Sequence, residues 1–112
     1  MTIGEWLDSR EPRPPAVLLD SLKAALGPEM NKDATEAAAV FLVAAERMLR
    51  ALISSGETGR PVAGDLLTID ALTTYAVESA AETLDSMPEF ADDAIARFAN
   101  IVKPGDYSPP RE

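Results

Sequence analysis

Residues Ala37-Ala-Ala-Val-Phe-Leu-Val-Ala-Ala-Glu-Arg-Met-Leu-Arg-Ala-Leu-Ile53 form the most apolar run of the chain and decide its fold. Placed on a helix at 100° per residue, their apolar side chains cover more than half of the circumference. The remaining strip carries the charged side chains of Glu36, Glu46, Arg47 and Arg50. Val43 lies within this polar strip. It is either a lone exposed valine or the mark of a further contact, between helices or between subunits.

Apolar residues also recur at helical spacing in four other segments, which are 2–9, 16–26, 65–85 and 88–102. The central helix is predicted to end at Ser55 and to be capped by Asn31 or Asp33. Thr2 and Glu5 have the spacing of a capping box. Segment 57–64 contains two glycines and a proline, which predicts a loop that joins the two long helices as an antiparallel pair.

The fold class predicted from this pattern is all-α. We expect a small four-helix bundle with two long antiparallel helices, a short N-terminal helical turn and an irregular C-terminal tail. The 112 residues fit one domain. Residues 1–103 are predicted to form a single helical domain, and residues 104–112 a proline-rich tail that is flexible or lies along the surface.

The composition excludes several classes of chemistry. The chain has no cysteine and no histidine, which removes thiolate metal sites, cysteine nucleophiles and the commonest general base. No cofactor is therefore expected, and an enzyme is less expected than a non-enzymatic protein. The net charge of −9 opposes direct binding to nucleic acid. With no secretion signal and no membrane-spanning stretch, we expect a cytoplasmic protein that does not bind membranes.

The acidic residues are unevenly placed along the chain. No lysine or arginine lies between Arg60 and Arg97, and the same stretch holds Asp65, Asp70, Glu78, Glu82, Asp85, Glu89, Asp92 and Asp93. This block is either a solvated face that keeps the protein soluble or an electrostatic patch for a basic partner. Part of it could also pair with Arg47 and Arg50 across the bundle.

Glu89 and Asp92 are the candidate metal ligands. The segment Glu89-Phe-Ala-Asp92 resembles the second half of the motif of all-helical nucleotide pyrophosphohydrolases of the MazG group. That resemblance implies a magnesium-dependent enzyme. The first half of the motif, Glu-x-x-Glu, is absent, and magnesium needs several converging oxygen ligands. Glu89 and Asp92 also fall in a first helical turn, where acids stabilise the helix dipole.

We therefore predict a protein-interaction module or a subunit of a complex, with a protein partner or a second copy of the chain as its partner. The partner-binding residues predicted for it are Val43, Arg47, Arg50, Tyr75, Glu78, Glu82 and Asp85. One alternative is a small-molecule-binding bundle with an apolar internal pocket, which the alanine-rich helix faces would permit. The other is the magnesium-dependent pyrophosphohydrolase.

Overall fold

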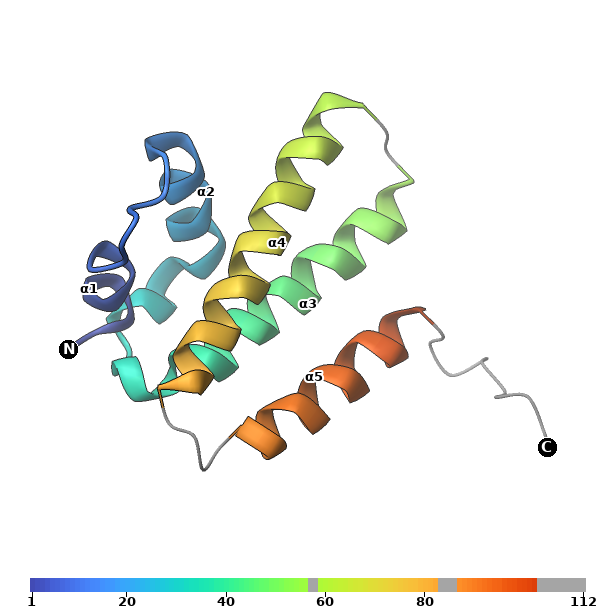
Figure 1. The fold of residues 1–112 in the computed structure, drawn as a ribbon. Helices are drawn as coiled ribbons and strands as arrows, with labels where there is room; N and C mark the ends of the chain where they lie inside the picture. The colour runs from blue at the N-terminus through green and yellow to red at the C-terminus, as the bar shows by residue number, and fades with distance from the viewer. Residues whose placement is uncertain (57–58, 83–86, 103–112) are drawn as a thin grey trace.

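The computed structural model describes residues 1–56, 59–82 and 87–102, and its regular elements are helices. In chain order they are α1 (Ile3–Asp8), α2 (Ala16–Leu26), the 3-10 helices η1 (Gly27–Asn31) and η2 (Ala34–Glu36), α3 (Ala37–Ser55), α4 (Arg60–Ala81) and α5 (Met87–Val102). The predicted all-α bundle is confirmed. The two longest helices, α3 and α4, run antiparallel to each other, with α1 and α2 on one side of the pair and α5 on the other (Figure 1).

The central apolar run predicted from the sequence is the middle of the core. Phe41 and Leu42 of α3 are fully buried, as is Leu72 of α4. Trp6 of α1 and Tyr75 of α4 both lie beside Phe41, with ring centroids 5.5 and 6.5 Å from the Phe41 ring. The α3 helix therefore contacts the N-terminal segment and the second long helix through one buried aromatic cluster.

The N-terminal helix is tied to the chain that precedes α3. The predicted capping box is present: Glu5 N donates to Thr2 Oγ1 at 3.1 Å, and Thr2 N donates to Glu5 Oε1 at 2.7 Å. Ile3 N donates to the Lys32 carbonyl and Ala34 N to the Met1 carbonyl, both at 2.9 Å. A six-residue helix is too short to be stable by itself, so these bonds and its buried side chains hold α1 in place.

The α4 helix begins at Arg60, so the loop predicted over 57–64 is wrong for its second half. Pro61 lies in the first helical turn, where its missing N–H has no intrahelical partner to lose. Gly59 precedes the helix with a φ of 102°, a conformation that side chains rarely adopt. Gly64 is accommodated inside the helix. The connection between the long helices is accordingly shorter than the glycine and proline content predicted.

Two other predicted helix ends also shift. Asp33 does act as a cap, but it accepts from Thr35 N at 2.9 Å and begins η2, so the α-helical part of the central segment starts only at Ala37. The α4 helix ends at Ala81, not at Asp85, which lies outside the described residues together with the predicted tail 104–112. Within the described ranges, no helix is both long and apolar enough to cross a membrane.

Candidate functional site

A groove of about 410 Å³ lies between the end of α2, η1 and the first part of α3. Its apolar lining comes from Ala25, Leu26, Ala39, Val40, Val43 and Ala44. Leu26 and Ala44 are almost completely buried, whereas Val43 remains 42% exposed. The valine that interrupts the polar strip of the central helix therefore lines a depression in the surface. We call this depression the α2–α3 groove.

Charged side chains of both signs form the rim of the α2–α3 groove. Glu29 and Lys32 form an ion pair at 2.8 Å, and the Glu29 carboxylate raises the pKa of the Lys32 ammonium. Arg47 lies on α3 and donates to the Ala25 carbonyl of α2. Glu36 completes the charged lining. The groove thus combines an apolar floor with a rim of both charges, which is the usual arrangement of a protein interface.

On another side of α3, the Glu46 carboxylate binds two arginines. Arg97 Nη1 of α5 donates to Glu46 Oε1 at 2.7 Å, and Arg50 Nε donates to Glu46 Oε2 at 3.1 Å. Arg97 Nε also bonds Asp93 at 3.0 Å. The side chain of Glu46 is only 14% exposed, so this cluster joins α5 to α3 through a largely buried carboxylate. Arg50 therefore serves a contact within the chain.

The Glu46 cluster should make the docking of α5 dependent on pH. The hydrogen bond from Arg97 is the largest cause that lowers the pKa of Glu46 below its ordinary value of 4.5. A lowered pKa stabilises the folded state at pH values above 4.5, and this stabilisation is lost as the pH falls towards the pKa of the folded state. Ile101 of α5 is only 5% exposed, so we expect its methyl resonances to shift towards exposed values in this acidic range.

The Glu46→Gln variant should show those exposed Ile101 signals already at pH 7 and lose most of their acid dependence. Glu5 provides the matched control, because its pKa is also lowered but by bonds to Thr2 within α1. Glu5→Gln should leave the titration of Ile101 unchanged. Equal titrations in the native protein and in Glu46→Gln would contradict the assignment to Glu46.

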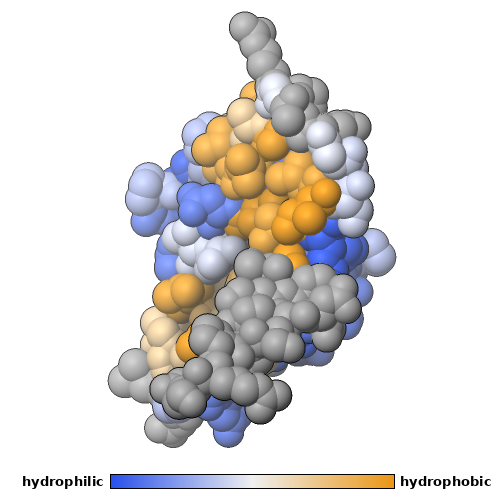
Figure 2. Space-filling model, turned by 90° about the vertical axis from the view of Figure 1, so that its right-hand side faces the viewer, coloured by the Kyte–Doolittle hydropathy of each residue, from blue (hydrophilic) through white to orange (hydrophobic). Residues whose placement is uncertain are grey.

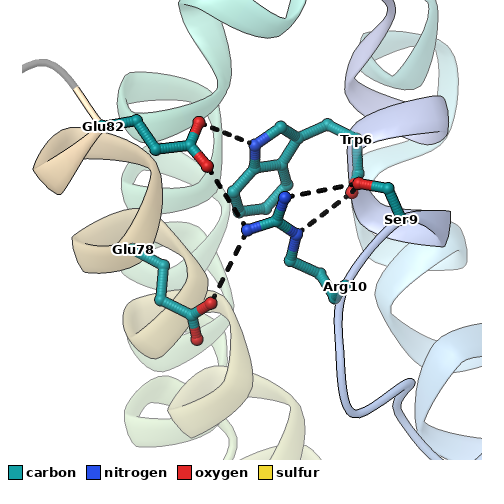
Figure 3. A network of polar contacts seen from close by, with 5 residues as sticks. All are labelled: Trp6, Ser9, Arg10, Glu78 and Glu82. Atoms are coloured by element: carbon teal, nitrogen blue, oxygen red, sulfur yellow. Dashed lines mark hydrogen bonds and ion pairs between the residues drawn. The ribbon is translucent and has the colours of Figure 1, made fainter.

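A second polar network joins the N-terminal segment to the end of α4 (Figure 3). Trp6 Nε1 donates to Glu82 Oε1 at 3.0 Å, and Arg10 forms ion pairs with Glu82 at 3.4 Å and with Glu78 at 3.8 Å. The Arg10 guanidinium lies 3.8 Å from the centroid of the Trp6 ring, as in a cation–π contact. Arg10 Nε and Ser9 Oγ both donate to the Trp6 carbonyl. This network holds α1 against α4.

The structure divides the predicted partner-binding residues among different places. Val43 and Arg47 lie together in the α2–α3 groove. Glu78 and Glu82 bind Arg10, which the sequence did not mark. Among the described residues, Arg50 pairs with Glu46 and Arg47 bonds the Ala25 carbonyl, so neither arginine pairs with a described residue of the acidic block. The remaining predicted residues are Arg50 in the Glu46 cluster, Tyr75 in the aromatic cluster, and Asp85 outside the described ranges.

Tyr75 is half-buried beside Trp6 and Phe41, and its pKa is raised by burial and, secondarily, by the Glu78 carboxylate. Its ring contributes to the core. Glu29 of η1 and Lys32, the residue that follows η1, also line the groove, and both were missed because no spacing along the sequence brings them next to the polar strip of α3. Only the turn made by η1 does so.

The candidate metal ligands Glu89 and Asp92 are both exposed on the first turns of α5. In the part of the chain that the structure describes, no group of three or more acidic side chains is placed to hold a metal ion. These two carboxylates therefore have no third acidic ligand among the described residues.

Comparison with known proteins found no match for this chain. No protein-family model matches the chain, and neither a curated protein nor a solved structure matches it. The function has to be argued from the residues of the chain itself.

Proposed function

We propose that this protein is a non-enzymatic interaction module that binds a protein partner in the α2–α3 groove. The observation that carries the proposal is the apolar floor of the groove, with the 42% exposed Val43 on the α3 side and charges of both signs around it. An apolar centre with a polar rim is the anatomy of protein interfaces. A partner that inserts apolar side chains would cover Val43 and meet Glu36 and Arg47 at the edge.

The internal contacts of the groove favour a site that exists before the partner arrives. Arg47 is bonded to the Ala25 carbonyl of α2, and Lys32 is paired with Glu29, so both cations of the rim are already positioned. A preformed site loses little side-chain entropy when it binds. The partner is either another protein or a second copy of this chain, and both belong to the same class of function.

We expect Val43→Asp to abolish partner binding, because it places an unpaired carboxylate where apolar side chains have to lie. The test compares affinity purification of the native protein and of the variant from the source cells, together with sedimentation of each purified protein. The substitution should lower the amount of any co-purifying protein, or the fraction of the chain that sediments as an oligomer, at least about tenfold. A loss of this size is expected for a residue central to an interface.

Val17→Asp is the matched control, since Val17 is 80% exposed on α2 and does not line the groove. This variant should retain the partner. Circular dichroism should show both variants folded, because both sites are accessible to water. A native protein that is strictly monomeric and recovers no protein dependent on Val43 would refute the proposal.

A second candidate function is the binding of a small amphiphilic molecule in the same groove. Its volume of about 410 Å³ lies within the range of small-molecule sites. The groove opens on the surface, so it differs from the internal pocket expected from the alanine-rich faces. Saturable binding of a medium-chain carboxylate such as decanoate, lost in Val43→Asp and kept in Val17→Asp, would favour this function over a protein partner.

A further inference from the structure

The α3 side of the α2–α3 groove has a symmetric order of residues. It is one helical stripe that starts at the N-cap residue of α3 and consists of Glu36, Ala39, Val40, Val43, Ala44 and Arg47. These residues follow one another at the spacing of a single helix face. Counted inward from either end, the stripe has a charged residue, then an alanine, then a valine, at the same intervals. Its two halves differ in the sign of the terminal charge.

A stripe of this kind is complementary to itself when two copies run antiparallel. A two-fold axis midway between Val40 and Val43 places Val40 of one chain opposite Val43 of the other. The same axis places Glu36 of each chain opposite Arg47 of the other. Two copies that run parallel would instead place like charges opposite each other. The order of the residues therefore favours the antiparallel arrangement.

The residues that would make these contacts are accessible. Val43 is 42% exposed, and Ala39 and both charged residues at the ends of the stripe are exposed as well. Arg47 donates to the Ala25 carbonyl, which is a neutral acceptor. Neither Arg47 nor Glu36 forms an ion pair among the described residues. Glu36 does contribute to the raised pKa of Lys32, but less than Glu29 does.

Small side chains in the groove allow a second helix to come close. Ala39 and Ala44 flank the two valines, and Ala25 lines the α2 side. The distance between the axes of two packed helices depends on the side chains at the contact, and small ones favour the short end of the range. The α3 helix of a second copy therefore fits against α2 and α3 and covers Val43.

We infer that the partner bound in the α2–α3 groove is a second copy of this chain, with the two α3 helices antiparallel about a two-fold axis. The inference rests on the function proposed for the groove and names its partner. The net charge of −9 opposes the association of two copies, but the charged lining of the groove sums to zero. At about 0.1 M salt, charges more than about 10 Å apart are largely screened, so the facing residues decide the contact.

Sedimentation equilibrium of the full chain at this salt concentration measures the dimer. We expect a reversible equilibrium between monomer and dimer, and a chain that stays monomeric up to about 1 mM would overturn the inference. Glu36→Arg should weaken the dimer about tenfold, because one substitution turns two symmetry-related attractions into repulsions. Arg47→Glu should weaken it by a similar factor for the same reason.

A mixture of these two single variants is the sharpest test of the antiparallel arrangement. In a mixed dimer each cation of the Glu36→Arg chain faces a carboxylate of the Arg47→Glu chain. The mixture should therefore form dimers more tightly than either variant alone and recover most of the native affinity. No recovery would overturn the inference. Asp20→Arg is the matched control, because it changes the net charge as Glu36→Arg does but lies on exposed α2 surface outside the groove. It should not weaken the dimer.

A further control separates this contact from another apolar area of the surface. Figure 2 views the molecule from the side on which α5 lies and shows apolar side chains gathered there. Ile95 of α5 is 69% exposed, so Ile95→Asp is compared with Val43→Asp. Only Val43→Asp should separate the dimer. Separation by Ile95→Asp alone would place the contact elsewhere and overturn the inference.

The same measurements distinguish failure of this inference from failure of the proposed function. A monomeric chain that recovers another protein in a Val43-dependent manner overturns the second copy as partner, while the groove remains an interaction site. A chain that neither forms a Val43-dependent dimer nor recovers a Val43-dependent partner overturns both.

Discussion

Phe41→Ala is expected to lower the free energy of unfolding by about 3–5 kcal/mol. Phe41 is fully buried in α3, and its ring lies 5.5 Å from the ring of Trp6 and 6.5 Å from that of Tyr75, centroid to centroid. Truncation removes buried apolar surface and leaves a cavity between three helices that cannot all close around it. Guanidinium denaturation followed by circular dichroism measures the loss.

Val17→Ala provides the baseline for this measurement, because Val17 is 80% exposed on α2. Its effect should stay within about 0.5 kcal/mol. A domain of this size has roughly 5–15 kcal/mol of stability in total. Phe41→Ala should therefore bring the chain close to unfolding at physiological temperature. A loss of less than about 1 kcal/mol would mean that the aromatic cluster is not the centre of the core.

Trp6→Ala is the second large effect, again about 3–5 kcal/mol. Trp6 is 3% exposed, contacts the rings of Phe41 and Tyr75, and donates its indole N–H to Glu82. The alanine variant removes both the ring and this bond. Because α1 has only six residues, its buried side chains are what fixes it to the bundle.

Trp6→Phe separates the two contributions of this side chain. It keeps an aromatic ring in the core but loses the donor to Glu82, at an expected cost of about 1–2 kcal/mol. Circular dichroism is again the measurement, since both substitutions remove the only tryptophan. Equal losses for Trp6→Ala and Trp6→Phe would show that the hydrogen bond outweighs the packing of the ring.

The apolar spacing of the sequence predicted where helices exist, because each helix buries one face and this constraint is local. It placed α2 at its observed bounds and placed Phe41 in the core. The start of α4 was predicted less well, because Gly59, Pro61 and Gly64 were all interpreted as loop residues. Proline interrupts the interior of a helix but is tolerated in its first turn, and the sequence alone did not tell which position Pro61 takes.

The pairing of charges could not be predicted in the same way. Arg10 meets Glu78 and Glu82 only because α1 packs beside the end of α4, an arrangement that depends on the whole fold. Within a helix the spacing is informative, since Glu46 and Arg50 lie four residues apart on the polar strip and form an ion pair. Val43 is an apolar residue on the polar strip of α3, and it lines the α2–α3 groove. An apolar residue on a polar strip violates a local rule, so its position drew attention to this part of the surface before the groove was known.

The hydrogen bond between Trp6 and Glu82 joins two residues 76 positions apart, and this spacing sets the order in which the fold can form. The α3–α4 pair needs only a short connection, so its closure costs less chain entropy. The α1 helix is synthesised before α4, yet the end of α4 that it contacts is made only after the whole of α3. Until residue 82 has been synthesised, Trp6 has no Glu82 carboxylate to bind, so α1 completes its docking only after the α3–α4 pair can form.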